Sequence, residues 1–121
     1  MSNICNCPKP PGGSVSCRDD QLAVCGYRNG EIVSGCFDPP GHAAFIADER
    51  EKNLIVANWV ASTVTGAVRD DNDPIEPHLF EILDSGRYVD EATGEILNFT
   101  LPSTLDLRNI RIQRHEAEGS I

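Results

Sequence analysis

All five cysteines of this 121-residue chain lie within its first 36 residues, among prolines and glycines. The segment from Cys5 to Asp20 contains so much proline and glycine that it rules out a helix and leaves little room for a strand. Such a loop buries little apolar area and forms few backbone hydrogen bonds, so its order has to come from a cross-link. The clustered thiols therefore constrain the fold more than any other feature.

The segment after this loop predicts a β-hairpin. Its centre is Asn29-Gly30, a dipeptide that favours a two-residue type I′ turn. The predicted strands are residues 21–28 and 31–37. The turn fixes the register, which pairs Arg28 with Glu31, Tyr27 with Ile32, Cys25 with Ser34 and Ala23 with Cys36. Cys25 and Cys36 then share one face, and the opposite face carries Leu22, Val24, Val33 and Phe37.

The geometry of this hairpin separates a disulfide from a metal site. Diagonal neighbours such as Cys25 and Cys36 have Cβ atoms up to ~7 Å apart, whereas a disulfide needs about 3.8 Å. Zn–S bonds of ~2.3 Å let two side chains at that separation converge on one ion. Loop thiols can complete the ligand set and so tie the loop to the hairpin. The sequence predicts a structural zinc site with ligands drawn from Cys5, Cys7, Cys17, Cys25 and Cys36.

The cysteine spacing leaves other interpretations open. The intervals of one, nine, seven and ten residues lack the paired C-x2-C knuckles of a strong zinc motif. Disulfides, thiols that are buried or free, and an iron–sulfur cluster are the alternatives, and either Cys5 or Cys7 is the expected spare thiol. His42, six residues after Cys36, is a further candidate ligand that would complete a Cys3His site.

Beyond the hairpin the pattern turns helical. Asp48 and Glu51 resemble a capping box, and Gly66 is suited to end the helix that they begin. Asp73 can cap a second helix whose first residue is Pro74. The predicted elements are a short turn before Asp48, a central core helix over residues 49–65, a second helix over residues 74–84 and a second hairpin over residues 87–99 that turns at Gly94.

These elements predict a single α+β domain over residues 1–121. It consists of an N-terminal cysteine-bearing loop and β-hairpin, a central helix, a second helix and a second β-hairpin. Residues 1–38 form a cysteine-rich subregion and residues 39–121 the α+β body. The tail from Pro102 fits two short strands as well as a helix that begins near Ser103.

The charge distribution bears on possible partners. The formal net charge is −9, and residues 1–36 are neutral because three basic and three acidic side chains balance there. An acidic body repels phosphate backbones, so nucleic-acid binding is not expected. No stretch approaches the ~20 apolar residues of a membrane span, so no membrane partner is expected. A protein partner or self-assembly is favoured instead.

The N-terminus has neither a basic start nor an apolar core of the kind that directs secretion, which predicts a cytoplasmic location. Reduced thiols there favour a metal or redox site over disulfides. No catalytic constellation is recognisable in the sequence. The leading hypothesis is a small non-catalytic interaction or assembly module stabilised by zinc. The alternatives are a redox protein, either an iron–sulfur carrier or a thiol sensor, and an exported or particle-surface structural protein with disulfides.

Overall fold

The computed structural model describes residues 2–8 and 13–110 of the chain. Four strands are followed by three helices, two further strands and a helical segment at residues 107–110. The strands are β1 (Ser2–Asn6), β2 (Ser14–Arg18), β3 (Leu22–Arg28), β4 (Glu31–Phe37), β5 (Arg87–Val89) and β6 (Ile96–Thr100). The helices are the 3-10 helix η1 (Gly41–Phe45) and the α-helices α1 (Glu49–Thr65) and α2 (Pro77–Ser85). None of the helices in the described residues is long and apolar enough to span a membrane.

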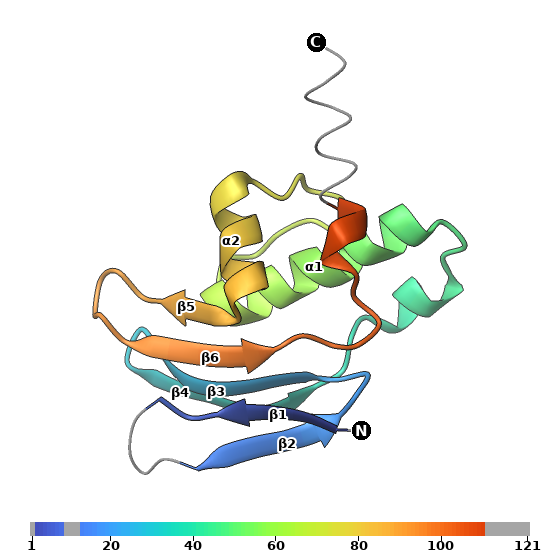
Figure 1. Ribbon diagram of the computed structural model, residues 1–121. Helices are drawn as coiled ribbons and strands as arrows, with labels where there is room; N and C mark the ends of the chain where they lie inside the picture. The colour runs from blue at the N-terminus through green and yellow to red at the C-terminus, as the bar shows by residue number, and fades with distance from the viewer. Residues whose placement is uncertain (1, 9–12, 111–121) are drawn as a thin grey trace.

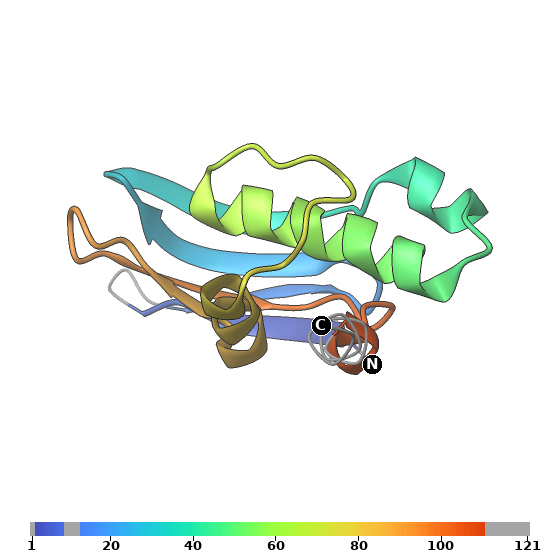
Figure 2. The same ribbon diagram turned by 90° about the horizontal axis from the view of Figure 1, so that it is seen from above.

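The elements form three layers. The central layer is an antiparallel sheet of four strands in the order β4-β3-β6-β5. Helices α1 and α2 lie on one face of this sheet, and the two-stranded sheet β1-β2 lies on the other, where β1 contacts β3 and β6 and β2 contacts β3 and β4 (Figure 1). Seen from above, α1 lies lengthwise over the sheet and α2 is viewed nearly end-on (Figure 2). The predicted small α+β domain is confirmed.

The first predicted hairpin is β3-β4, and its register is confirmed. Asn29 and Gly30 both have positive φ, 53° and 81°, as a type I′ turn requires. The observed pairs include Arg28 with Glu31, Tyr27 with Ile32, Cys25 with Ser34 and Ala23 with Cys36. Because side chains alternate along a strand, the apolar face packs under the helices and the cysteine face points toward β1-β2.

The central helix α1 has the predicted bounds. An Asp48 carboxylate oxygen accepts hydrogen bonds from the N–H groups of Arg50 (2.9 Å) and Glu51 (3.4 Å). Gly66 ends the helix in the left-handed conformation, with φ 81°. The buried face of α1 packs over the apolar face of the sheet, and this core includes Leu22, Val24, Ile55, Val56, Val60, Val64, Leu97 and Phe99.

Helix α2 begins three residues later than predicted. Pro77, not Pro74, occupies its first turn, and Glu76 before it is extended, with ψ 158°. A residue that precedes proline is disfavoured in the helical region, so a helix that began at Pro74 could not have run through Glu76. The Asp73 carboxylate accepts a hydrogen bond from the Asp70 N–H (3.0 Å) and so stabilises the preceding loop.

The prediction that residues 5–20 form an unpaired loop is wrong. Residues 2–6 and 14–18 are the antiparallel strands β1 and β2, which pair Cys5 with Val15 and Asn3 with Cys17. The prolines that argued against strands stand at positions 8, 10 and 11, all in the connection between β1 and β2. Proline content averaged over the segment therefore concealed two short strands on either side.

The second hairpin is confirmed as β5-β6, with Gly94 at φ 74° in its turn. In the tail, residues 107–110 are helical, so the helical alternative is observed there, but the helix begins at residue 107 and not near Ser103, where the chain forms a turn. The remainder of the predicted tail, residues 111–121, lies outside the described part of the chain.

Candidate functional site

The cysteines gather where the two sheets face each other. Cys7 forms a disulfide with Cys25 of β3, and Cys17 of β2 forms a disulfide with Cys36 of β4. The Cα atoms are 5.0 Å apart in the first pair and 5.5 Å apart in the second, within the usual range for disulfides. Each disulfide joins the β1-β2 hairpin to the four-stranded sheet, so two covalent bonds hold these layers together.

The predicted metal site is not formed. Four of the five proposed ligands, Cys7, Cys17, Cys25 and Cys36, are used in disulfides, and only Cys5 retains a thiol. Among the described residues, no group of three or more His, Cys, Asp or Glu side chains could hold a metal ion. The zinc prediction and the iron–sulfur alternative are therefore both wrong.

His42, the other proposed ligand, lies away from the sulfurs. Its Nε2 is 2.8 Å from a carboxylate oxygen of Asp71, and both side chains are about half exposed. This contact joins η1 to the loop between α1 and α2.

The two disulfides could not be predicted from the β3-β4 hairpin alone, because the partners of Cys25 and Cys36 lie outside it. Cys25 and Cys36 do share a face and do not bond to each other, as predicted. With residues 5–20 treated as a loop, however, nothing placed Cys7 or Cys17 opposite them. The alternation of Cys5 and Cys7, and of Val15 and Cys17, was the available signal, because it is typical of strands with one face directed inward.

The disulfides also overturn the predicted cytoplasmic location. Disulfides form and persist in oxidising compartments and are rare where glutathione and thioredoxin keep thiols reduced. Two of them within the first 36 residues indicate an oxidising environment.

The remaining thiol, Cys5, is buried in the space between the sheets. Only 3% of its surface is exposed, and it packs with Cys17, Ala23 and Cys25 in a second apolar cluster separate from the main core. Burial raises the pKa of the Cys5 thiol, although a hydrogen bond from the backbone of Cys25 acts in the opposite direction. The thiol is therefore kept neutral and away from solvent.

Polar side chains supplement the disulfides. The Asn3 side-chain amide donates to the backbone oxygens of Asp19 (3.2 Å), Gln21 (2.8 Å) and Leu101 (3.1 Å). From β6, the Thr100 hydroxyl donates to the Ile4 oxygen and the Asn98 amide donates to the Asn6 oxygen, both at 2.8 Å. The hairpin β1-β2 is thus attached by hydrogen bonds as well as by sulfur, in a contact that sequence reasoning did not find.

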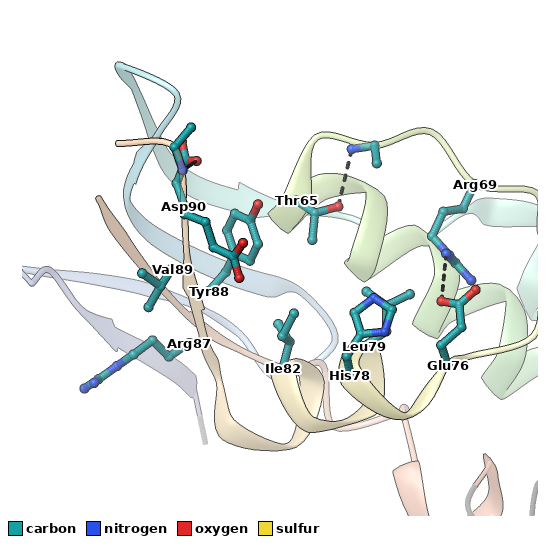
Figure 3. A pocket seen from close by; sticks show the side chains of 13 residues that line it. Thr65, Arg69, Glu76, His78, Leu79, Ile82, Arg87, Tyr88, Val89 and Asp90 are labelled. Carbon is teal, nitrogen blue, oxygen red and sulfur yellow. Dashed lines mark hydrogen bonds and ion pairs between the residues drawn. The ribbon is translucent and has the colours of Figure 1, made fainter. Parts of the chain in front are cut away.

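An open groove lies on the helix side of the domain. It lies between the end of α1, helix α2 and strand β5 and has a volume of about 580 Å³. His78 and Ile82 of α2 line one side and Tyr88 and Val89 of β5 the other (Figure 3).

Several of the charged groups around this groove, among them Arg69 and Asp90, are engaged in structural contacts. The Arg69 guanidinium donates to the Asn58 side-chain oxygen (2.7 Å) and the Pro74 backbone oxygen (2.7 Å), and it lies 3.5 Å from the Glu76 carboxylate (Figure 3). Asn58, which is almost fully buried, donates in turn to two carbonyl groups of the same loop. Arg69 is therefore held in place as part of the α1–α2 connection.

Asp90 has a comparable role at the other end of the groove. Its carboxylate accepts hydrogen bonds from the Asn29 N–H (2.8 Å), the Ala92 N–H (3.1 Å) and the Thr93 hydroxyl (3.0 Å). Burial would raise the pKa of this carboxyl, but these hydrogen bonds outweigh burial and lower it. Asp90 thus remains ionised and joins the turns of the two hairpins.

The groove therefore presents apolar side chains beside Arg69 and Asp90, which have partners, and beside the exposed side chains of Arg87 and Glu91, for which no partner is found among the described residues. The most organised group of functional side chains in the described structure is the set of five cysteines between the two sheets. Comparison of the chain with protein-family models, with curated proteins and with solved structures finds no match.

Proposed function

We propose that this chain is a disulfide-stabilised structural protein of an oxidising environment, exported or carried on the surface of a particle, which acts through contact with protein. The observation that carries this proposal is the position of the two disulfides. Both join separate layers of the domain, and neither closes a turn within one element. Their effect is to keep a thin outer layer in place.

The outer layer needs such support because it has little apolar surface of its own. The hairpin β1-β2 contributes only four buried or half-buried apolar side chains to the interface, those of Cys5, Cys7, Val15 and Cys17. Each disulfide spans 18 or 19 residues of sequence, and closing a loop of that length stabilises the folded state by about 3 kcal/mol in the chain-entropy model. Two such bonds are comparable with the whole stability of a small domain.

An odd number of cysteines leaves one that could bond to a neighbouring chain. Cys5 is buried, so a link between folded chains through this thiol is not part of the proposal. Contact with other proteins would instead be non-covalent.

The proposal is tested on protein directed to an oxidising compartment and purified without reductant. We expect one thiol per chain after denaturation, and an intact mass about four hydrogen masses below that of the fully reduced chain. Reductant should lower the melting temperature by about 10 °C or more.

The matched control is Cys5→Ala, which removes the free thiol and leaves both disulfides. It should retain the full response to reductant. Five thiols per chain, or a melting temperature that does not change on reduction, would refute the proposal.

A further inference from the structure

One edge of the central sheet is open. β4 is the last strand on its side of the sheet, and it pairs only with β3. The type I′ turn makes Arg28 and Glu31 a hydrogen-bonded pair, so the backbone groups of Glu31, Val33, Gly35 and Phe37 point toward β3. Those of Ile32, Ser34 and Cys36 point outward, and no partner is found for them in the described part of the chain.

The opposite edge of the sheet is better protected. β5 has only three residues, and the Ser85 side-chain oxygen lies 3.2 Å from both the backbone N and the backbone O of Arg87. This leaves Val89 as the one residue of β5 whose outward groups are open. β4 has seven residues and contains no proline or lysine, the residues that commonly protect an edge. The two edges therefore differ in their capacity to accept another strand.

We infer that two copies of this chain associate through antiparallel pairing of their β4 strands about a twofold axis at Ser34. In this register Ser34 stands opposite Ser34 of the other copy, and Ile32 stands opposite Cys36 in both directions. Every outward residue then meets another outward residue, which permits about six backbone hydrogen bonds across the axis. The result is one continuous eight-stranded sheet.

The side chains of β4 suit this self-pairing. Ile32 is 70% exposed, and in the dimer it would cover the disulfide-bonded Cys36 of the other copy. On the helix side, Glu31 would face Phe37 and Val33 would face Gly35, so no like charges stand directly opposite. The carboxylate that directly follows β4, that of Asp38, accepts hydrogen bonds from Arg18 and Gln21, both at 3.1 Å.

The net charge predicts how this association responds to salt. Each copy carries a formal charge of −9, so the two chains repel each other at low ionic strength. Salt screens this repulsion, and dimerisation should strengthen as salt is raised. A cationic strand from a different protein would show the opposite dependence.

This inference rests on the proposed structural role and names its partner as a second copy. The test measures the molar mass of the disulfide-intact protein by light scattering as a function of concentration. The test variants are Ser34→Lys and Ser34→Glu, which place like charges opposite each other at the twofold axis. Each alone should weaken dimerisation at least about tenfold, and an equimolar mixture of the two should restore it.

Proline variants give an independent check with a matched control. Ser34→Pro removes an outward N–H without loss of a backbone hydrogen bond to β3, although the contact of the Ser34 hydroxyl with Cys25 Sγ (3.6 Å) is lost, and it should abolish the dimer. Val89→Pro makes the same change at the β5 edge and should leave dimerisation unchanged. Melting curves establish that each variant is folded.

A chain that remains monomeric up to about millimolar concentration overturns the inference, and so does a dimer that persists in Ser34→Pro. If β4 instead accepts a strand of another protein, the isolated chain will remain monomeric, which is the first of these results. If such a monomer still has two disulfides and melts earlier on reduction, the proposed function stands and only the dimer fails.

Discussion

At the scale of single residues, Gly26 sets how closely β3 and β6 approach. Its φ is 151°, and a Cβ atom added there would lie 2.5 Å from the Ile96 backbone oxygen and 2.6 Å from the Leu97 Cα. Both obstacles are backbone atoms, which cannot move without separating the strands. Only glycine fits this position, next to the disulfide-bonded Cys25.

We therefore expect Gly26→Ala to lower the free energy of unfolding by about 2–4 kcal/mol. Gly41→Ala is the control, because a Cβ atom there meets nothing within 4 Å and the backbone is not left-handed. It should change stability by less than about 0.5 kcal/mol. Denaturant titrations of the two variants give the comparison, and equal midpoints would contradict the proposed clash.

The buried thiol of Cys5 predicts a dependence of stability on alkaline pH. Its pKa is raised above the ordinary value of 9.0 in the folded chain, so the unfolded chain loses this proton first. Stability is then unaffected below the unfolded pKa and falls as pH rises from there toward the folded pKa. Between about pH 8 and pH 10, the wild type should lose more stability than Cys5→Ala. If rapid unfolding measurements show the same loss of stability in the wild type and in Cys5→Ala, Cys5 does not titrate in this way.

At the scale of elements, the connection between α1 and α2 depends on one buried side chain. Asn58 is 1% exposed, donates to the backbone oxygens of Asp71 and Asp73 (both 3.0 Å), and accepts from Arg69. It is a polar residue in the middle of the apolar face of α1. Its position is explained by its hydrogen bonds to the loop between α1 and α2.

Asn58→Ala would leave two carbonyl groups and a guanidinium short of a partner. We expect the free energy of unfolding to fall by about 2–3 kcal/mol. Asn72→Ala, in the exposed part of the same loop, should have little effect. The measurement is thermal unfolding followed by circular dichroism, and a stable Asn58→Ala variant would show that water replaces these contacts.

The elements also show what the sequence could and could not predict. Turn and cap residues such as Asn29, Asp48 and Gly94 act on their neighbours, so the bounds of the hairpins and of α1 followed from local chemistry. The partners of Cys25 and Cys36 depend on a strand pair whose existence was hidden by an intervening run of prolines. The turn at Asn29-Gly30 placed Cys25 and Cys36 on one face of the hairpin. Their bonding partners could be identified only once the β1-β2 sheet was known to lie against that face.

At the scale of the whole molecule, the formal charge of −9 opposes compactness as well as association. The melting temperature should therefore rise by several degrees between about 20 mM and about 0.5 M NaCl. The reduced protein should show a larger rise, because it lacks the covalent bonds that hold its layers together. Scanning calorimetry at several salt concentrations measures this melting temperature. A melting temperature that falls as salt is raised would indicate that specific ion pairs dominate.

The two disulfides are interlaced along the chain, because Cys17 lies between Cys7 and Cys25, and Cys25 lies between Cys17 and Cys36. A mechanical load applied at Ser2 would consequently stretch only the residues before Cys7. From that point the Cys7–Cys25 bond carries the tension directly into β3, an inner strand of the four-stranded sheet, while the Cys17–Cys36 bond holds β2 to β4. A tether attached at this end would hold under forces that peel apart a hairpin secured by hydrogen bonds alone.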